Sequence, residues 1–154
     1  MAAHQIRRLS ENLFIQQIKN IASLVDGTFP ATYLDASKWA RFAFLISVGA
    51  SDDTAVTAQV VQATAAAGTG KKNVTGAVIT NTSLASASGS NKWAMIEVDQ
   101  EHLDIANDFA WVSLDVAATG GSATTMSIFF FGIEPSVKPP VFGSDKAEIV
   151  YLDG

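Results

Sequence analysis

The stretch KWAMIEVDQEHLDIANDFAWVSLDVA, residues 92–117, decides the fold class. In its first half, every second residue is apolar: Ala94, Ile96 and Val98. The same alternation returns in its second half: Ala110, Val112, Leu114 and Val116. Because successive side chains of an extended chain point to opposite faces, both halves are predicted to be half-buried β-strands. The acidic segment 99–104 between them favours a turn, or one helical turn capped by Asp99.

Composition limits the class of protein. The 154 residues are 48% hydrophobic and 16% charged, which is too apolar for a disordered chain and sufficient for one core. A formal net charge of -5 argues against a nucleic-acid partner, because phosphate binding requires a basic surface. The lack of cysteine excludes disulfides and thiolate metal sites. Residues 1–20 contain no unbroken apolar signal core, so neither secretion nor a membrane partner is expected.

Residues 1–31 are expected to form an N-terminal helix or arm. Ser10 is placed to cap a helix, and Asp26-Gly27 to end it. Between them, apolar residues follow a spacing of three to four: Leu13, Phe14, Ile18, Ile21, Leu24 and Val25. The alternative is an extended arm, because the β-branched and aromatic residues of this segment also suit a strand.

Residues 32–133 are predicted to form one β-sandwich domain. Besides the two strands above, strands are expected at residues 39–48, 54–64, 73–80 and 124–133, and a short edge strand follows the linker at the start of residues 29–34. The first two of these are predicted to form a hairpin. About seven short strands without alternating helices favour an antiparallel sandwich of jelly-roll or immunoglobulin-like type.

Residues 134–154 are predicted to be an extended tail. Pro135, Pro139 and Pro140 stiffen it, and it carries two apolar anchors, Val141-Phe142 and the segment 149–152 that contains Tyr151. We expect at least one end of the chain to act as an arm that contacts a neighbour.

Two segments superficially suggest chemistry. Gly68-Thr69-Gly70-Lys71-Lys72 has Lys72 where a phosphate-binding loop needs Ser or Thr, and no long helix follows it. An exposed loop is therefore favoured. An acidic cluster with one histidine could hold a metal: Asp99, Glu101, His102, Asp104 and Asp108. Its spacing fits no known calcium or zinc motif, so a solvated turn is favoured. The sequence therefore predicts no enzyme, no cofactor and no metal.

The chain has more apolar surface than one core requires. If the even-numbered residues of the main strands face inward, a second apolar set faces the other way: Leu45, Trp93, Met95, Phe109, Trp111, Phe129, Phe131 and Ile133. Either the N-terminal helix or another subunit must cover this second face.

Several strand and turn segments between residues 33 and 132 carry a resemblance to a known family. They are YLD (33–35), WARF (39–42), AVTAQVVQAT (55–64), GTGKK (68–72), IEV (96–98), LD (103–104) and FAWVSLDV (109–116). In this order they resemble the capsid decoration, or cement, proteins of tailed bacteriophages.

The resemblance implies a structural virion protein on the capsid exterior, assembled in the bacterial host cytoplasm. Such proteins sit at threefold positions, often as trimers, and clamp neighbouring copies of the major capsid protein. On this interpretation the interface with other copies or with the capsid contains two groups of residues: Trp93, Met95, Trp111, Phe129 and Phe131 in the sandwich, and Val141, Phe142 and Tyr151 in the tail.

The alternative function is a carbohydrate-binding or other interaction module of a phage tail or baseplate. Such a module would present an exposed aromatic ring for stacking on a sugar, and Trp39, Trp93 or Trp111 could supply it. Tryptophans in strands are more often packing residues.

Overall fold

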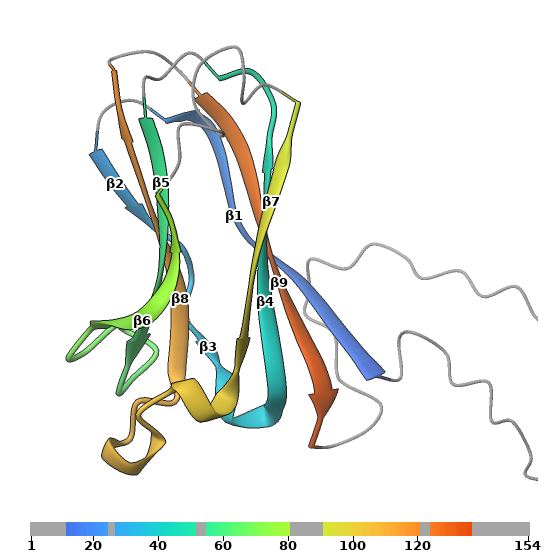
Figure 1. Cartoon of the computed structure of the whole chain (residues 1–154), viewed down its shortest axis with the longest axis vertical. Coiled ribbons are helices and arrows are strands. Elements are labelled where there is room, and N and C mark those ends of the chain that lie inside the picture. The colour runs from blue at the N-terminus through green and yellow to red at the C-terminus, as the bar shows by residue number, and fades with distance from the viewer. Residues whose placement is uncertain (1–11, 25–26, 52–54, 81–90, 121–123, 137–154) are drawn as a thin grey trace, which may run out of the picture.

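Two antiparallel β-sheets face each other in the computed structural model, which describes residues 12–24, 27–51, 55–80, 91–120 and 124–136 (Figure 1). Sheet 1 has the strand order β1 (Leu13–Leu24), β9 (Thr124–Pro135), β4 (Trp39–Val48), β7 (Trp93–Asp99). Sheet 2 has the order β2 (Gly27–Pro30), β8 (Trp111–Thr119), β5 (Ala55–Ala63), β6 (Lys72–Ile79), and β3 (Leu34–Asp35) also pairs with β8. The prediction of a mainly β sandwich is confirmed.

The core lies between the sheets and follows the expected alternation. Phe42, Phe44 and Ile46 of β4 are fully buried against Val112, Leu114 and Val116 of β8 and further apolar residues of both sheets. The ring of Phe130 stacks on Phe42 at a centroid distance of 5.9 Å and meets Phe44 edge-on at 5.5 Å. Burial of every second residue thus stabilises both sheets at once.

The predicted hairpin of residues 39–48 and 54–64 is wrong. The corresponding strands, β4 and β5, belong to opposite sheets: β4 pairs with β7 and β9, and β5 pairs with β6 and β8. β7 and β8, which the opening stretch of sequence contains, are likewise in opposite sheets. The links between these strands cross from one sheet to the other, which lets each strand bury its apolar side in the shared core.

The predicted N-terminal helix is also wrong, because residues 13–24 form β1 at the edge of sheet 1. The register between β1 and β9 shifts between Gln17 and Lys19, which is a β-bulge or irregularity. This shift changes the phase of the alternation, so Phe14, Ile18 and Ile21 all become buried although they are spaced by four and three residues. The spacing of apolar residues in this bulged strand therefore resembles that of a helix. The sandwich includes residues that the sequence assigned to an arm. Ser10 and Val25 lie outside the described residues.

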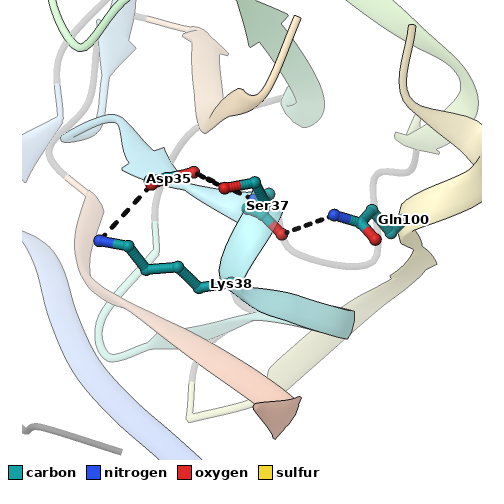
Figure 2. A network of polar contacts seen from close by, with 5 residues as sticks. Asp35, Ser37, Lys38 and Gln100 are labelled. Atoms are coloured by element: carbon teal, nitrogen blue, oxygen red, sulfur yellow. Dashed lines mark hydrogen bonds and ion pairs between the residues drawn. The ribbon is translucent and has the colours of Figure 1, made fainter. Parts of the chain in front are cut away.

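A short 3-10 helix, η1 (Ala36–Lys38), carries the chain from β3 of sheet 2 to β4 of sheet 1. Figure 2 shows the polar contacts that hold it: Asp35 accepts hydrogen bonds from the backbone N–H and the hydroxyl of Ser37, at 3.1 and 2.6 Å, and pairs with Lys38 at 3.5 Å. Gln100 donates to the carbonyl of Ala36 at 3.4 Å, which joins this end of the sandwich to the link between β7 and β8.

The segment after β7 forms the single helical turn that the sequence allowed, followed by another. These are the 3-10 helices η3 (Gln100–His102) and η4 (Ile105–Asn107). Asp99 stands at the start of η3, yet its side chain makes no capping hydrogen bond and instead accepts one from Arg41. The capping role predicted for Asp99 is therefore wrong. Across the described ranges, no helix has the length and apolar character needed to cross a bilayer.

Candidate functional site

The outer face of sheet 1 carries a band of apolar side chains that come from all four strands. The strand register sets Ile15 of β1, Phe131 of β9 and Ala43 of β4 in one row. Phe129, Leu45 and Met95 form the next row, on β9, β4 and β7. Cross-strand partners lie on the same face of a sheet, and so do residues two positions apart on one strand. The two rows therefore adjoin. We call Ile15, Leu45, Met95, Phe129 and Phe131 the apolar band.

Exposure distinguishes this band from the core behind it. Met95 is 48% exposed and Ile15 is 39% exposed, whereas Leu45, Phe129 and Phe131 are half-buried. Side chains that remain partly in water have not gained the full free energy of burial. A contiguous group of this kind on a sheet face is typical of an interaction surface.

An ion-paired group adjoins the band on the same face: Arg41 and Asp99 are partners in the row beyond it, and Glu97 is the partner of Ala43 in its first row. Arg41 donates from Nε to Asp99 at 2.8 Å and from Nη1 to Glu97 at 3.3 Å. The hydrogen bond to Asp99, then the charge of Asp99 and the contact with Glu97, raises the pKa of Arg41. All three side chains are about half exposed, so these pairs chiefly neutralise charge and contribute little to stability.

At the opposite end of the face, a third row forms the floor and walls of a hollow. Asn20, Ser127, Ser47 and Trp93 are partners across β1, β9, β4 and β7. They line an open hollow of about 460 Å³ together with backbone and side chains at the adjoining strand ends, among them Gly49, Asn91, Lys92 and Thr125. Trp93 is 67% exposed, so its indole ring forms a wall that is open to solvent.

The predicted interface residues are thus partly separated. Trp93, Met95, Phe129 and Phe131 share the outer face of sheet 1, as the alternation of their strands implied. Trp111 is on β8 of sheet 2, where it pairs with Ala63 and Asp35, so its assignment to the same face is wrong. Phe109 precedes that strand and also lies away from the band. Val141, Phe142 and Tyr151 lie outside the described residues.

Ile15 is the member of the band that sequence reasoning missed. On a helix, Ile15 would lie beside residues three and four positions away along the chain. The helical interpretation of residues 13–24 therefore did not place it beside the strand residues of the band. Its β-branched side chain, next to the aromatic Phe14, was the signal for a strand. The N-terminal segment therefore extends the exposed face that it was one candidate to cover.

The two lysines of the glycine-rich segment 68–72 make contacts within the chain. Lys71 donates to Asp115 at 2.8 Å, and Lys72 pairs with Asp104 and lies 3.7 Å from the centre of the Phe109 ring. The hydrogen bond to Asp115 raises the pKa of Lys71, and the one from Lys72 lowers the pKa of Asp104. These lysines thus hold the loop against β8 and the turn after β7.

The structure brings together three of the five residues of the acidic cluster. Ligand atoms of Asp99, Glu101 and His102 lie within 4.8 Å of one another. Asp104 instead accepts hydrogen bonds from Lys72 and Asn107. Asp99 is held by Arg41, so a cation at this cluster would compete with an existing ion pair.

No protein-family model and no curated protein matches the chain. Solved structures with a similar arrangement include a chain of Bacillus endospore appendages, described as disulfide-linked pili, with a TM-score of 0.46 and 9% identity over 82% of this chain and 91% of that one. The Tobacco streak virus coat protein has a TM-score of 0.41 and 7% identity over 95% and 99%. A CBM4 structure has a TM-score of 0.35 and 12% identity over 82% and 88%. Likenesses at this level carry no argument about function.

Proposed function

We propose that this protein is a structural virion protein that decorates the outside of a tailed-bacteriophage capsid as a homo-oligomer, most simply a trimer. The observation that carries the proposal is the apolar band on the outer face of sheet 1. The resemblance of residues 33–132 to capsid decoration proteins is the basis for proposing attachment to a capsid, the major capsid protein as the partner and a threefold arrangement. The proposed role is structural and requires no catalytic residue, cofactor or metal.

A second copy of this chain is the occupant that we propose for the band. Apolar side chains of one copy can be buried against apolar side chains of another, whether two copies meet face to face or three copies surround a common axis. Arg41 offsets one of the two negative charges of Glu97 and Asp99 on the same face, in a chain whose formal charge is -5. Copies that meet through this face therefore experience less repulsion than the two unpaired carboxylates would cause.

Burial of the band supplies the driving force that we propose for association without covalent links. Covering several large apolar side chains on each copy contributes on the order of 10 kcal/mol before the costs of association. The chain contains no cysteine, so this burial has to hold the copies together without disulfides.

The oligomer would stabilise the capsid by mass action. A protein that binds only the assembled lattice lowers the free energy of that lattice by its own binding free energy. Attachment of several linked copies multiplies the effect, because the second contact of an oligomer forms at high effective concentration. This mechanism requires no catalytic activity of the decoration protein.

The test places a charge in the band and compares it with a matched change elsewhere. Ile15→Asp should convert the oligomer to a monomer in light scattering and weaken co-sedimentation with capsids. Val78→Asp is the control, since Val78 of β6 is also 39% exposed but belongs to sheet 2. A wild-type protein that is monomeric both in solution and on the capsid would contradict the proposal.

A further inference from the structure

The hollow beside Trp93 has properties that an interface between copies does not require. Among the three tryptophans, Trp39 is 8% exposed and Trp111 is half-buried, whereas Trp93 is 67% exposed. An indole in water loses the free energy that its burial would provide. Its ring offers a flat apolar surface with an N–H donor at its edge, which suits a ligand that has both apolar faces and hydroxyl groups.

Small polar side chains make the floor of the hollow. Ser127 and Ser47 lie between Asn20 and Trp93, whereas the adjoining row has the larger Phe129, Leu45 and Met95. The depression therefore follows from the change of side-chain size between two rows. The Ser127 hydroxyl donates to the Asn20 amide oxygen over 3.3 Å, so two polar groups point into one space.

Backbone hydrogen bonds fix the rim of the hollow. The N–H of Val48 donates to Lys92 at 2.8 Å, and the N–H of Asn91 donates to Gly49 at 2.8 Å. Gly49 also donates to the carbonyl of Thr125 at 2.9 Å, and a Cβ at Gly49 would lie 2.4 Å from the Thr125 hydroxyl. The ends of β4, β7 and β9 are thus locked together, which lowers the cost of ordering the site when a ligand binds.

We propose that this hollow is a saccharide-binding site, in which a sugar ring stacks on Trp93 and its hydroxyls bond to Asn20, Ser47 and Ser127. The C–H face of a pyranose matches the indole, and hydroxyl and amide groups both donate to and accept from sugar hydroxyls. Lys92 is the charged residue of the lining, so the site suits neutral or acidic sugars. This activity is separate from the proposed contact between copies and would let a virion protein hold a surface glycan.

The experiment screens the full-length protein on an array of neutral and acidic oligosaccharides and titrates the strongest binder by isothermal titration calorimetry, which does not depend on Trp93 as a reporter. Stacking on the exposed Trp93 should shift the tryptophan emission of the wild type. Trp93→Ala should weaken binding at least about tenfold, the loss expected when an aromatic contact is removed. Asn20→Ala and Ser127→Ala should each weaken binding by roughly threefold to tenfold through a lost hydrogen bond.

Two controls separate this site from the proposed oligomer. Trp111→Phe, on the other sheet, should leave saccharide binding unchanged. Phe131→Asp, two rows from Trp93, should disrupt the oligomer and retain saccharide binding, whereas Asn20→Ala should do the reverse. The proposal is overturned if no saccharide on the array binds the wild type, if Trp93→Ala binds as tightly as the wild type, or if neither Asn20→Ala nor Ser127→Ala weakens binding.

Discussion

At the scale of single residues, Gly132 determines how closely the aromatic core packs. Its row across sheet 1 contains Phe14 and Phe42, and the ring of Trp39 lies directly over it. A Cβ at this position would lie 2.3 Å from the Trp39 ring, closer than carbon atoms approach. Trp39 in turn stacks on Phe14 at 5.0 Å, so the missing side chain lets an edge strand join the core.

Gly132→Ala should therefore destabilise the fold by about 1–3 kcal/mol, the usual cost of overpacking a core. Urea unfolding followed by circular dichroism would measure the loss. Ser47→Ala, on the outer face of the same sheet, should change stability by less than about 0.5 kcal/mol. In a Trp39→Leu background the same glycine change should cost less, since the clash is gone; equal losses in both backgrounds would contradict the steric explanation.

At the scale of elements, a side chain repairs the irregular pairing of β5 and β6. The register shifts between Gln59 and Val61, which interrupts the ladder of backbone hydrogen bonds. The Gln59 amide nitrogen lies 2.8, 3.0 and 3.1 Å from the carbonyl oxygens of Val60, Val74 and Ala77. It supplies the donor that these carbonyls lose where regular pairing stops.

Gln59→Glu should destabilise the protein by about 1–3 kcal/mol at neutral pH, because a carboxylate has nearly the same shape but cannot donate. Gln59→Met should cause a loss of similar size. Hydrogen exchange should show the added opening in β6 and little change in β1. If Gln59→Glu unfolds at the same urea concentration as the wild type, the amide does not hold this strand.

At the scale of the whole molecule, the ends of the chain and the sheet faces have separate roles in the proposed assembly. β9 ends at Pro135, so Glu134 and Pro135 belong to sheet 1 and not to the tail predicted for residues 134–154. The N–H of Ser136 donates to the carbonyl of Lys38 at 2.9 Å. The described part of the sandwich thus extends to Ser136, which precedes the predicted tail anchor Val141-Phe142 in the sequence. Attachment to the capsid can then be tested apart from folding.

A protein that ends at Ser136 should keep its melting temperature but co-sediment less with capsids, because it lacks the predicted anchors. Differential scanning calorimetry and capsid pelleting would measure the two properties side by side. A full-length variant with Val141→Asp and Phe142→Asp controls for chain length. Undiminished pelleting of both proteins would show that the tail does not contribute to attachment.

Side-chain alternation in the sequence determined the positions of most strands and their buried sides. Residues 39–48 form β4 over that same range, and Ile96, Val98, Val112 and Leu114 are buried as expected. This information is local, because the pleat of one strand fixes which side each residue faces. Trp93, Met95, Phe129 and Phe131 could be placed on outward faces for the same reason.

Only the tertiary structure decided which strands pair, and therefore which outward residues meet. Pairing joins residues far apart in sequence, such as Leu45 with Met95 and Phe129, so neither neighbour of β4 follows from its own pattern. The same contacts made residues 13–24 a bulged strand beside β9 instead of a helix, and added Ile15 to the band. They also separated Trp111 from Trp93, because successive strands cross between sheets to share one core.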